Sequence, residues 1–192
     1  AYAAYVAGTI SHDKYKDIVR HACPTPGICP FMGTAHTMCA TAEILGFTPH
    51  GNASVRAESD EWRQMAVLAA RRIMELVHDE IRPLDVVKQS NFENAVAYMM
   101  ATGGSTNSIL HIPAIARQTG IAITPEVFDK ISRKVPVIST IYPNHEKYTM
   151  VEFSEAGGLG AVIAELARKG LVDVSTKGMF GTLAEKIALS KN

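Results

Sequence analysis

The sequence has few cysteines, no surplus charge of either sign and no long apolar run. Three cysteines in 192 residues are too few for the disulfide framework of a small secreted domain. Lys and Arg together number 19, as do Asp and Glu, so the formal net charge is zero. A nucleic-acid-binding module or a polybasic membrane module carries a basic surplus, and both are therefore excluded. No apolar run approaches the roughly 18 residues that cross a bilayer, so we expect no transmembrane segment.

The apolar content is sufficient for a folded core. Hydrophobic residues make up 47% and charged residues 20% of the chain, which is typical of a globular protein. At this length we expect one domain or a large part of one. The chain begins with AYAAYVAG, without an initiator methionine or a signal peptide. We therefore expect a piece of a longer protein, located in the cytoplasm or in an organelle matrix.

Hydrophobic periodicity predicts a mostly helical chain. We expect one strand at 135–140, where β-branched residues dominate, and helices at 13–21, 35–45, 59–80, 92–101, 105–120, 124–134, 161–169 and 182–190. Gly46 is expected as the C′ glycine of the second helix, and Thr124 with Pro125 begins the sixth. Asn91 is expected to cap the helix at 92–101, whereas Pro113 should kink or interrupt the helix at 105–120.

The longest predicted helix, at 59–80, begins at Ser59, a residue type that favours the N-cap position. Within it, side chains recur at spacings of three and four residues, which is typical of a stripe that faces a core. The residues of this predicted buried stripe are Met65, Leu68, Ala69, Arg72, Ile73 and Leu76.

All three cysteines lie in one short window, at Cys23, Cys29 and Cys39. Their spacing, C-x5-C-x9-C, matches neither a zinc-finger pair nor a ferredoxin run. Cys23 and Cys29 flank a Pro-Gly turn, so a rigid loop could direct one or both at a metal or a cluster, whereas Cys39 suits a small buried position in a helix. Two interpretations stay open: inert cysteines, or at least one metal ligand.

The number of cysteines limits any iron–sulfur site. A four-thiolate cluster needs four cysteines and the chain has three. Either the site is completed from outside this segment, or one iron lacks a thiolate. An iron with an open position is a Lewis acid that can take a substrate hydroxyl and help it leave as water.

A second candidate site is the turn Gly103-Gly104-Ser105-Thr106-Asn107. Two glycines allow the backbone to approach a ligand, and the helix that follows offers free N–H groups and a positive dipole end to a carboxylate or phosphate. We predict substrate binding by Gly104, Ser105 and Thr106. The alternative is an ordinary glycine C-cap followed by a serine N-cap between two packed helices.

Five segments in the same order carry a resemblance to a known family. They read HACPTPGICPFMGTAHTMCATAEILGF, IRPLDVVKQSNFENAV, ATGGSTNSILHIPAIA, FDKISRKVPVIS and KYTMVEFSEAGGLGAVIAELARKGLV. The chain resembles the iron–sulfur dihydroxy-acid dehydratase and sugar-acid dehydratase family over nearly all of its length. The resemblance implies an α/β fold: residues 1–192 would be a helix-rich segment of a larger N-terminal α/β domain, with few short parallel strands.

The resemblance also implies a cofactor. The family holds a cluster, [2Fe-2S] or alternatively [4Fe-4S], through three cysteines that are widely spread in a longer chain. Cys29 matches a ligand, Cys23 matches a family cysteine that is not the usual ligand, and Cys39 has no consistent counterpart. The family's Cys-Asp-Lys segment, which brings a further cluster cysteine and Mg²⁺ ligands, has no match here. The same is true of the C-terminal β-barrel domain, which carries the serine base.

The implied reaction is the loss of water from a 2,3-dihydroxy acid, which gives a 2-keto acid. The resemblance implies as substrate either a branched-chain dihydroxy acid or a sugar acid such as an aldonate, and the run Met32-Gly33-Thr34-Ala35 is similar to the sugar-acid branch. We assign no catalytic residue within the segment and expect it to be inactive alone. The resemblance implies a homodimer or homotetramer. Two alternatives remain: a non-catalytic packing or dimerisation fragment, and a small metal-binding domain that uses Cys23, Cys29 and His36.

Overall fold

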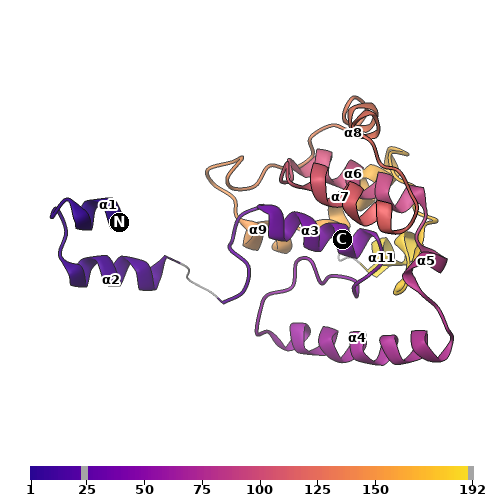
Figure 1. The fold of residues 1–192 in the computed structure, drawn as a ribbon, viewed down its shortest axis with the longest axis horizontal. Coiled ribbons are helices and arrows are strands. Elements are labelled where there is room, and N and C mark those ends of the chain that lie inside the picture. Colours follow the sequence, from indigo (N-terminus) through magenta and orange to yellow (C-terminus); the bar gives the residue numbers. More distant parts are fainter. Residues whose placement is uncertain (23–25, 190–192) are drawn as a thin grey trace.

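The central element of the structure is the helix α6 (Gln89–Thr102). The structure is a computed structural model that describes residues 1–22 and 26–189. Ten of the fourteen residues of α6 are buried. A helix that is enclosed on nearly all sides belongs to the interior of a protein. Four helices pack around it (Figure 1): α3 (Thr34–Ile44), α7 (Ser108–Gln118), α8 (Pro125–Ser132) and α10 (Gly158–Arg168).

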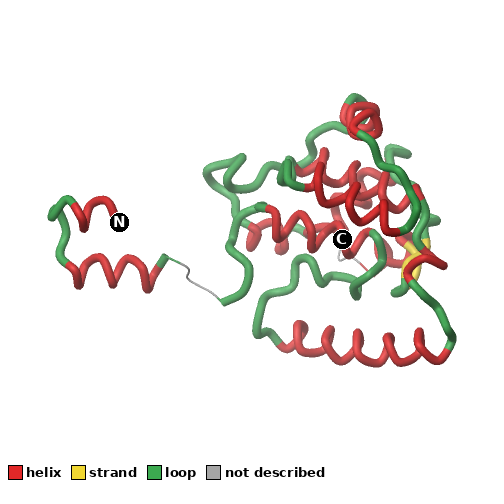
Figure 2. Tube along the Cα trace, in the orientation of Figure 1, coloured by secondary structure: helices red, strands yellow, loops and turns green. Residues whose placement is uncertain are grey.

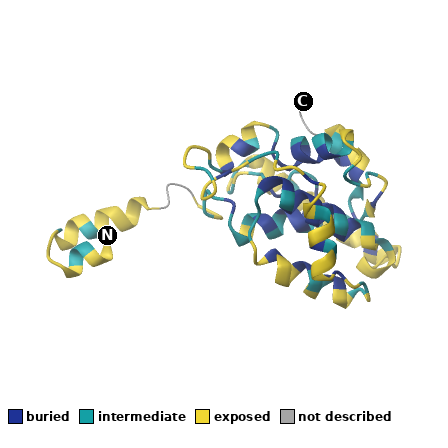
Figure 3. Ribbon diagram, turned by 90° about the horizontal axis from the view of Figure 1, so that it is seen from above, coloured by how far each residue is buried: buried dark blue, intermediate teal, exposed yellow. Residues whose placement is uncertain are grey.

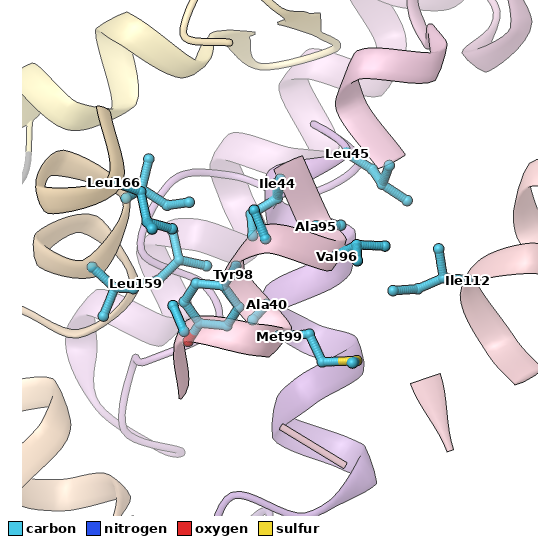
Figure 4. Close-up of a cluster of buried hydrophobic side chains, with 14 of the residues drawn as sticks. Ala40, Ile44, Leu45, Ala95, Val96, Tyr98, Met99, Ile112, Leu159 and Leu166 are labelled. Atoms are coloured by element: carbon cyan, nitrogen blue, oxygen red, sulfur yellow. The ribbon is translucent and has the colours of Figure 1, made fainter. Parts of the chain in front are cut away.

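Side chains from these helices meet in one apolar core. Figure 4 shows Ile44 of α3, Val96 and Tyr98 of α6, Ile112 of α7 and Leu166 of α10 within the cluster, and each is at most 2% exposed. Burying a side chain of this size stabilises the fold by about 1.5–3 kcal/mol. The position of α6 is therefore fixed by contacts on several sides.

Six further helices are described, and two of them add Met150, Phe153 and Leu183 to the same core. Their bounds are α1 (Tyr2–Val6), α2 (His12–His21), α4 (Asp60–His78), α5 (Pro83–Val86), α9 (Met150–Glu155) and α11 (Leu183–Leu189). α1 and α2 hold each other through the stacked rings of Tyr5 and Tyr15, 5.1 Å apart, and neither helix has a buried residue (Figure 3). Across the described ranges, every helix is too short or too polar to cross a membrane.

The helix-rich class expected from the sequence is confirmed, but the predicted strand direction is wrong. Strands β1 (Lys177–Gly178) and β2 (Gly181–Thr182), which are yellow in Figure 2, form the sheet. They pair antiparallel, with Lys177 opposite Thr182 and Gly178 opposite Gly181. Only Met179 and Phe180 connect them. A parallel pair needs a crossover of about a dozen residues, so this connection permits only the antiparallel arrangement.

The strand predicted at 135–140 does not form. The segment is extended, but its N–H groups at Ile138 and Ser139 both donate to the carbonyl of Ala101, at 2.7 and 3.1 Å. These two N–H groups thus satisfy a carbonyl in the last turn of α6 and are not available to a neighbouring strand.

The buried stripe predicted on α4 is largely wrong. Leu76 is the one buried residue of this helix, whereas Leu68 and Ile73 are 52% and 54% exposed. The half-buried residues Met65, Ala69 and Arg72 lie on the same side as Leu76. α4 therefore contacts the rest of the described chain along one narrow stripe. Its other apolar residues, Leu68 and Ile73 among them, lie on a face that no described residue covers.

Several helix ends follow the predicted local chemistry. The Ser59 hydroxyl accepts the Trp62 N–H at 3.1 Å and begins α4, Thr124 precedes Pro125 at the start of α8, and Gly46 follows α3 with φ +81°. Pro113 lies within α7 without interrupting it.

Two predicted helix starts are wrong. α6 begins at Gln89, before Asn91, whose side-chain oxygen accepts the Lys88 N–H at 3.0 Å from inside the first turn. α7 begins at Ser108 and not at Ser105. The reason is that the Ser105 N–H donates to the Thr37 hydroxyl of α3, so a tertiary contact fixes the residues before the helix.

We predict that Gly46→Ala destabilises the protein more than Gly120→Ala. Both glycines have a positive φ, +81° and +74°, which costs alanine about 1–2 kcal/mol. A Cβ at Gly46 would overlap the backbone of Gly178, whereas a Cβ at Gly120 meets no atom within 4 Å. Chemical denaturation should show about 1–3 kcal/mol of additional loss for Gly46→Ala, because β1 must move. Equal losses would contradict this packing.

Candidate functional site

The loop that carries Cys29 is bounded by prolines and anchored in the core. Gly27 has φ +98°, and a Cβ there would come within 2.7 Å of the Ala57 Cβ, so a glycine is required. Met32 is 3% exposed and packs in the core, whereas the Cys29 thiol is free and half-buried. The loop thus carries a free, half-buried cysteine on a backbone that a buried side chain and a required glycine constrain.

Three hydrogen bonds hold this loop in place. The Met150 N–H donates to the Pro30 carbonyl at 2.7 Å, and the Met32 N–H donates to the Tyr142 carbonyl at 2.8 Å. His36 Nε2 donates to the Cys29 carbonyl at 3.0 Å, and because a carbonyl only accepts, Nε2 carries the proton. The backbone on both sides of Cys29 is therefore fixed by α3 and by the segment 142–150.

The turn at 103–107 packs against the first turn of α3, the helix that follows the Cys29 loop in the sequence. The Ser105 N–H donates to the Thr37 hydroxyl at 3.0 Å, and the hydroxyls of Thr34 and Ser105 lie 3.0 Å apart. The Asn107 side-chain amide donates to the Thr34 hydroxyl at 2.8 Å. The structure thus joins the two segments that the sequence singled out, through one shared helix end.

The glycine pair in this turn is explained by packing. Gly103 is the left-handed C-cap of α6, with φ +60°, and its carbonyl accepts the Asn144 amide at 2.7 Å. A Cβ at Gly104 would lie 3.0 Å from both Met99 Cγ and Thr37 Cγ2. The space that a side chain at Gly104 would need is therefore filled by Met99 and Thr37. Of the three predicted substrate-binding residues, Ser105 is half-buried and Thr106 is exposed.

A cavity of about 590 Å³ lies beside the Cys29 loop. Ile28 and Pro30 line it, together with His36 and the whole segment 52–58. Cys29 itself and the residues Gly104, Ser105 and Thr106 are not among the described residues that line this cavity. The cavity therefore adjoins the Cys29 loop but does not include the predicted site residues in its lining.

A buried carboxylate that the sequence analysis missed shapes the cavity wall. Glu43 is fully buried, and its two oxygens accept the N–H groups of Gly51 and Ala53, both at 2.8 Å. His50 Nδ1 lies 3.2 Å from the same carboxylate. The Lys186 ammonium donates to the Glu43 carbonyl, and burial lowers the pKa of Lys186. The available signal was a lone acidic residue in the otherwise uncharged run 37–47.

The thiols differ in their surroundings. Burial raises the pKa of the Cys39 thiol, and the nearby Glu43 carboxylate raises it further, so Cys39 stays protonated and unreactive. Cys23 lies outside the described residues. In the ranges 1–22 and 26–189, no three His, Cys, Asp or Glu side chains are grouped to hold a metal ion. Within these ranges the structure therefore offers no complete metal site, and the role of Cys29 as a cluster ligand stays a prediction.

Comparisons with known proteins identify a family. Residues 1–186 match the family model described as dihydroxy-acid/6-phosphogluconate dehydratase N-terminal. The mitochondrial dihydroxy-acid dehydratase of Schizosaccharomyces pombe is 39% identical over 97% of this chain and 31% of its own length. The dihydroxy-acid dehydratase of Ruminiclostridium cellulolyticum is 39% identical over 100% of the chain and 35% of its own length. The chain thus spans about a third of the length of these relatives.

We predict that His36 makes stability fall as the pH drops below about 6.5. Burial lowers the pKa of folded His36, partly offset by the backbone of Cys29 and Ala53, so the unfolded chain takes up the proton first. The free energy of unfolding should therefore decrease through this range, with a slope of at most about 1.4 kcal/mol per pH unit.

Denaturation at several pH values between 7 and 5 measures this slope. His36→Gln should reduce it, because glutamine retains a donor for the Cys29 carbonyl but does not titrate. The control is His78→Gln, at a side chain that is 89% exposed and that should leave the slope unchanged. A slope that His36→Gln does not alter would remove His36 from this role.

Proposed function

The chain belongs to the dihydroxy-acid/6-phosphogluconate dehydratase N-terminal family, and from this premise we propose that the protein carrying it is a hydro-lyase. Its proposed substrate is a 2,3-dihydroxy acid, either a branched-chain dihydroxy acid or a sugar acid such as an aldonate. Loss of the C2 proton and of the C3 hydroxide releases one water and leaves an enol, which tautomerises to a 2-keto acid. Relatives at 39% identity that are named dihydroxy-acid dehydratases support this reaction.

The observation that carries the proposal is the shared attachment to α3. The Cys29 loop leads directly into this helix, and the turn at 103–107 bonds to its first residues, Thr34 and Thr37. A thiol that suits a metal and a helix end that suits an anion are thereby held by the same helix. A dehydratase for an acidic substrate needs both groups near each other.

We propose Cys29 as one ligand of an iron–sulfur cluster, [2Fe-2S] or alternatively [4Fe-4S]. The half-buried, free thiol supports this role. The other cluster ligands and most Mg²⁺ ligands would come from polypeptide outside this chain. When bound, such a cluster supplies a Lewis-acidic iron that stabilises the departing hydroxide.

Within this chain, the proposed contribution to substrate binding comes from Ser105 and Thr106. They precede α7, whose positive dipole end favours a carboxylate. The exposed Thr106 hydroxyl can donate a hydrogen bond to that carboxylate. The Gly104 N–H already donates to the Met99 carbonyl at 3.0 Å, so Gly104 would contribute only through its carbonyl, which can accept from a substrate hydroxyl.

The wider organisation also belongs to the proposal. Residues 1–192 would form part of the N-terminal domain, and the chain's coverage of about a third of its relatives supports this. We also propose that the full-length protein forms a homodimer or homotetramer, and the exposed apolar residues of α4 support this proposal. Light scattering on the full-length protein measures its oligomeric state.

We predict that Cys29→Ser abolishes both the cluster absorbance and the dehydratase activity of the full-length protein. A serine oxygen is a poor substitute for a thiolate toward iron. The matched control is Cys39→Ser, which changes a protonated half-buried thiol and should retain both properties. Iron and acid-labile sulfide are measured after anaerobic purification.

Two outcomes would contradict the cluster assignment. Retention of absorbance and activity by Cys29→Ser would remove this residue from the site. One equivalent of zinc without sulfide in the wild-type protein would instead support the small metal-binding alternative.

We predict that Thr106→Val raises KM for the dihydroxy acid about 10-fold and leaves the fold unchanged. The substitution removes one hydroxyl of an exposed residue, and a hydrogen bond to a charged group contributes about 1.5–3 kcal/mol. Steady-state kinetics should be compared with Thr119→Val at the other end of α7, where the hydroxyl bonds to the Ala116 carbonyl. If the two variants have the same KM, Thr106 does not contact the substrate.

A further inference from the structure

A second cavity lies beside α6, and no described residue of the Cys29 loop lines it. It measures about 460 Å³ and is enclosed by the N-terminal half of α6, by α8 with the residues after it, and by the segment 170–173. Figure 1 shows α8 beside α6, and these two helices are in direct contact. The cavity shares no lining residue with the one beside Cys29. Its volume falls within the range of small-molecule sites, about 300–1,000 Å³.

The inner surface of this cavity is aliphatic. Its apolar lining residues are Val127, Ile131, Val135, Leu171 and Val172. Val135 belongs to the buried core, and the other four are partly buried and pack against it. A ligand that contacts this surface would gain from removing apolar area from water.

One rim of the cavity is cationic. Lys130 and Lys134 are one turn apart on and after α8, and both are exposed. Neither ammonium makes a hydrogen bond or ion pair with the part of the chain that the structure describes. The neighbouring Asp129 is engaged by Arg133 at 2.8 Å. The two ammonium groups are therefore available to a carboxylate.

Two carboxylates, those of Glu93 and Asp173, also line the cavity, and both are held in place by hydrogen bonds. The Ser175 hydroxyl and N–H donate to the Asp173 carboxylate and hold the pKa of Asp173 below its usual range. The backbone of Asp173 is fixed by two hydrogen bonds with the Asn94 side chain, both 2.8 Å. The Glu93 carboxylate accepts the Gln89 amide at 2.8 Å. These carboxylates suit an ammonium group.

We propose that this cavity binds an α-amino acid with an aliphatic side chain. The carboxylate would lie at Lys130 and Lys134, the ammonium group at Glu93 and Asp173, and the side chain on the aliphatic surface. A phosphate ester or a dicarboxylate fits less well, because it would bring negative charge to Glu93 and Asp173 as well. Binding here does not depend on the dehydratase activity.

Isothermal titration calorimetry of the full-length protein with L-leucine tests the proposal. We expect saturable binding of one L-leucine per chain. Three analogues each lack one recognised feature: 4-methylpentanoate lacks the ammonium group, 3-methylbutylamine lacks the carboxylate, and L-serine lacks the aliphatic side chain. Each should bind at least about 10-fold more weakly, which corresponds to about 1.4 kcal/mol.

Variants place the binding in this cavity. The double substitution Lys130→Gln and Lys134→Gln should raise the Kd for L-leucine at least 10-fold, as should Glu93→Gln alone. The control Lys16→Gln removes an exposed lysine of α2 and should leave the Kd unchanged. Circular dichroism confirms that each variant is folded.

Three results would overturn the assignment. They are the absence of saturable heat with L-leucine, a Kd that the double lysine variant does not change, and equally tight binding of 4-methylpentanoate. The last result would show that Glu93 and Asp173 take no part.

Discussion

The contact between the first turn of α3 and the turn after α6 determines the arrangement of the candidate site. Thr34 and Thr37 supply the hydroxyls, and Ser105 and Asn107 supply the groups that bond to them. These bonds satisfy polar groups at a helix end, where unpaired donors and acceptors are costly. As a result, α3 connects the Cys29 loop at its N-terminus with the glycine turn, and a shift of this helix would move both.

The buried Glu43 organises the opposite end of the same helix. A fully buried carboxylate is costly unless its oxygens are hydrogen-bonded, and here the backbone N–H groups of Gly51 and Ala53 meet that need. The segment 51–53 is thereby fixed as one wall of the cavity beside Cys29. α3 therefore links three features: the Cys29 loop before its first residue, the contact with the glycine turn at Thr34 and Thr37, and the buried carboxylate of Glu43 near its end.

Local signals in the sequence were sufficient to predict helix ends that depend only on residues close to the end. Ser59 begins α4, Gly46 follows α3, and Pro125 lies at the first position of α8, because capping and turn conformations are decided within a few residues. The same reasoning failed at Ser105, whose N–H is taken by a distant hydroxyl. It also failed at 135–140, where β-branched residues favour a strand but the α6 carboxyl end takes the donors.

The sequence by itself determined a mostly helical chain, the family resemblance and the two segments around Cys29 and Gly104, because these depend on local periodicity and on motifs. The tertiary structure decided which apolar positions are buried. Ile73 continues the spacing of Leu76 yet is 54% exposed, because a helix can present more apolar faces than the surrounding chain covers. It also brought together the charged residues of the second cavity, since α6, α8 and the segment after α10 are distant in sequence and meet only when the core packs.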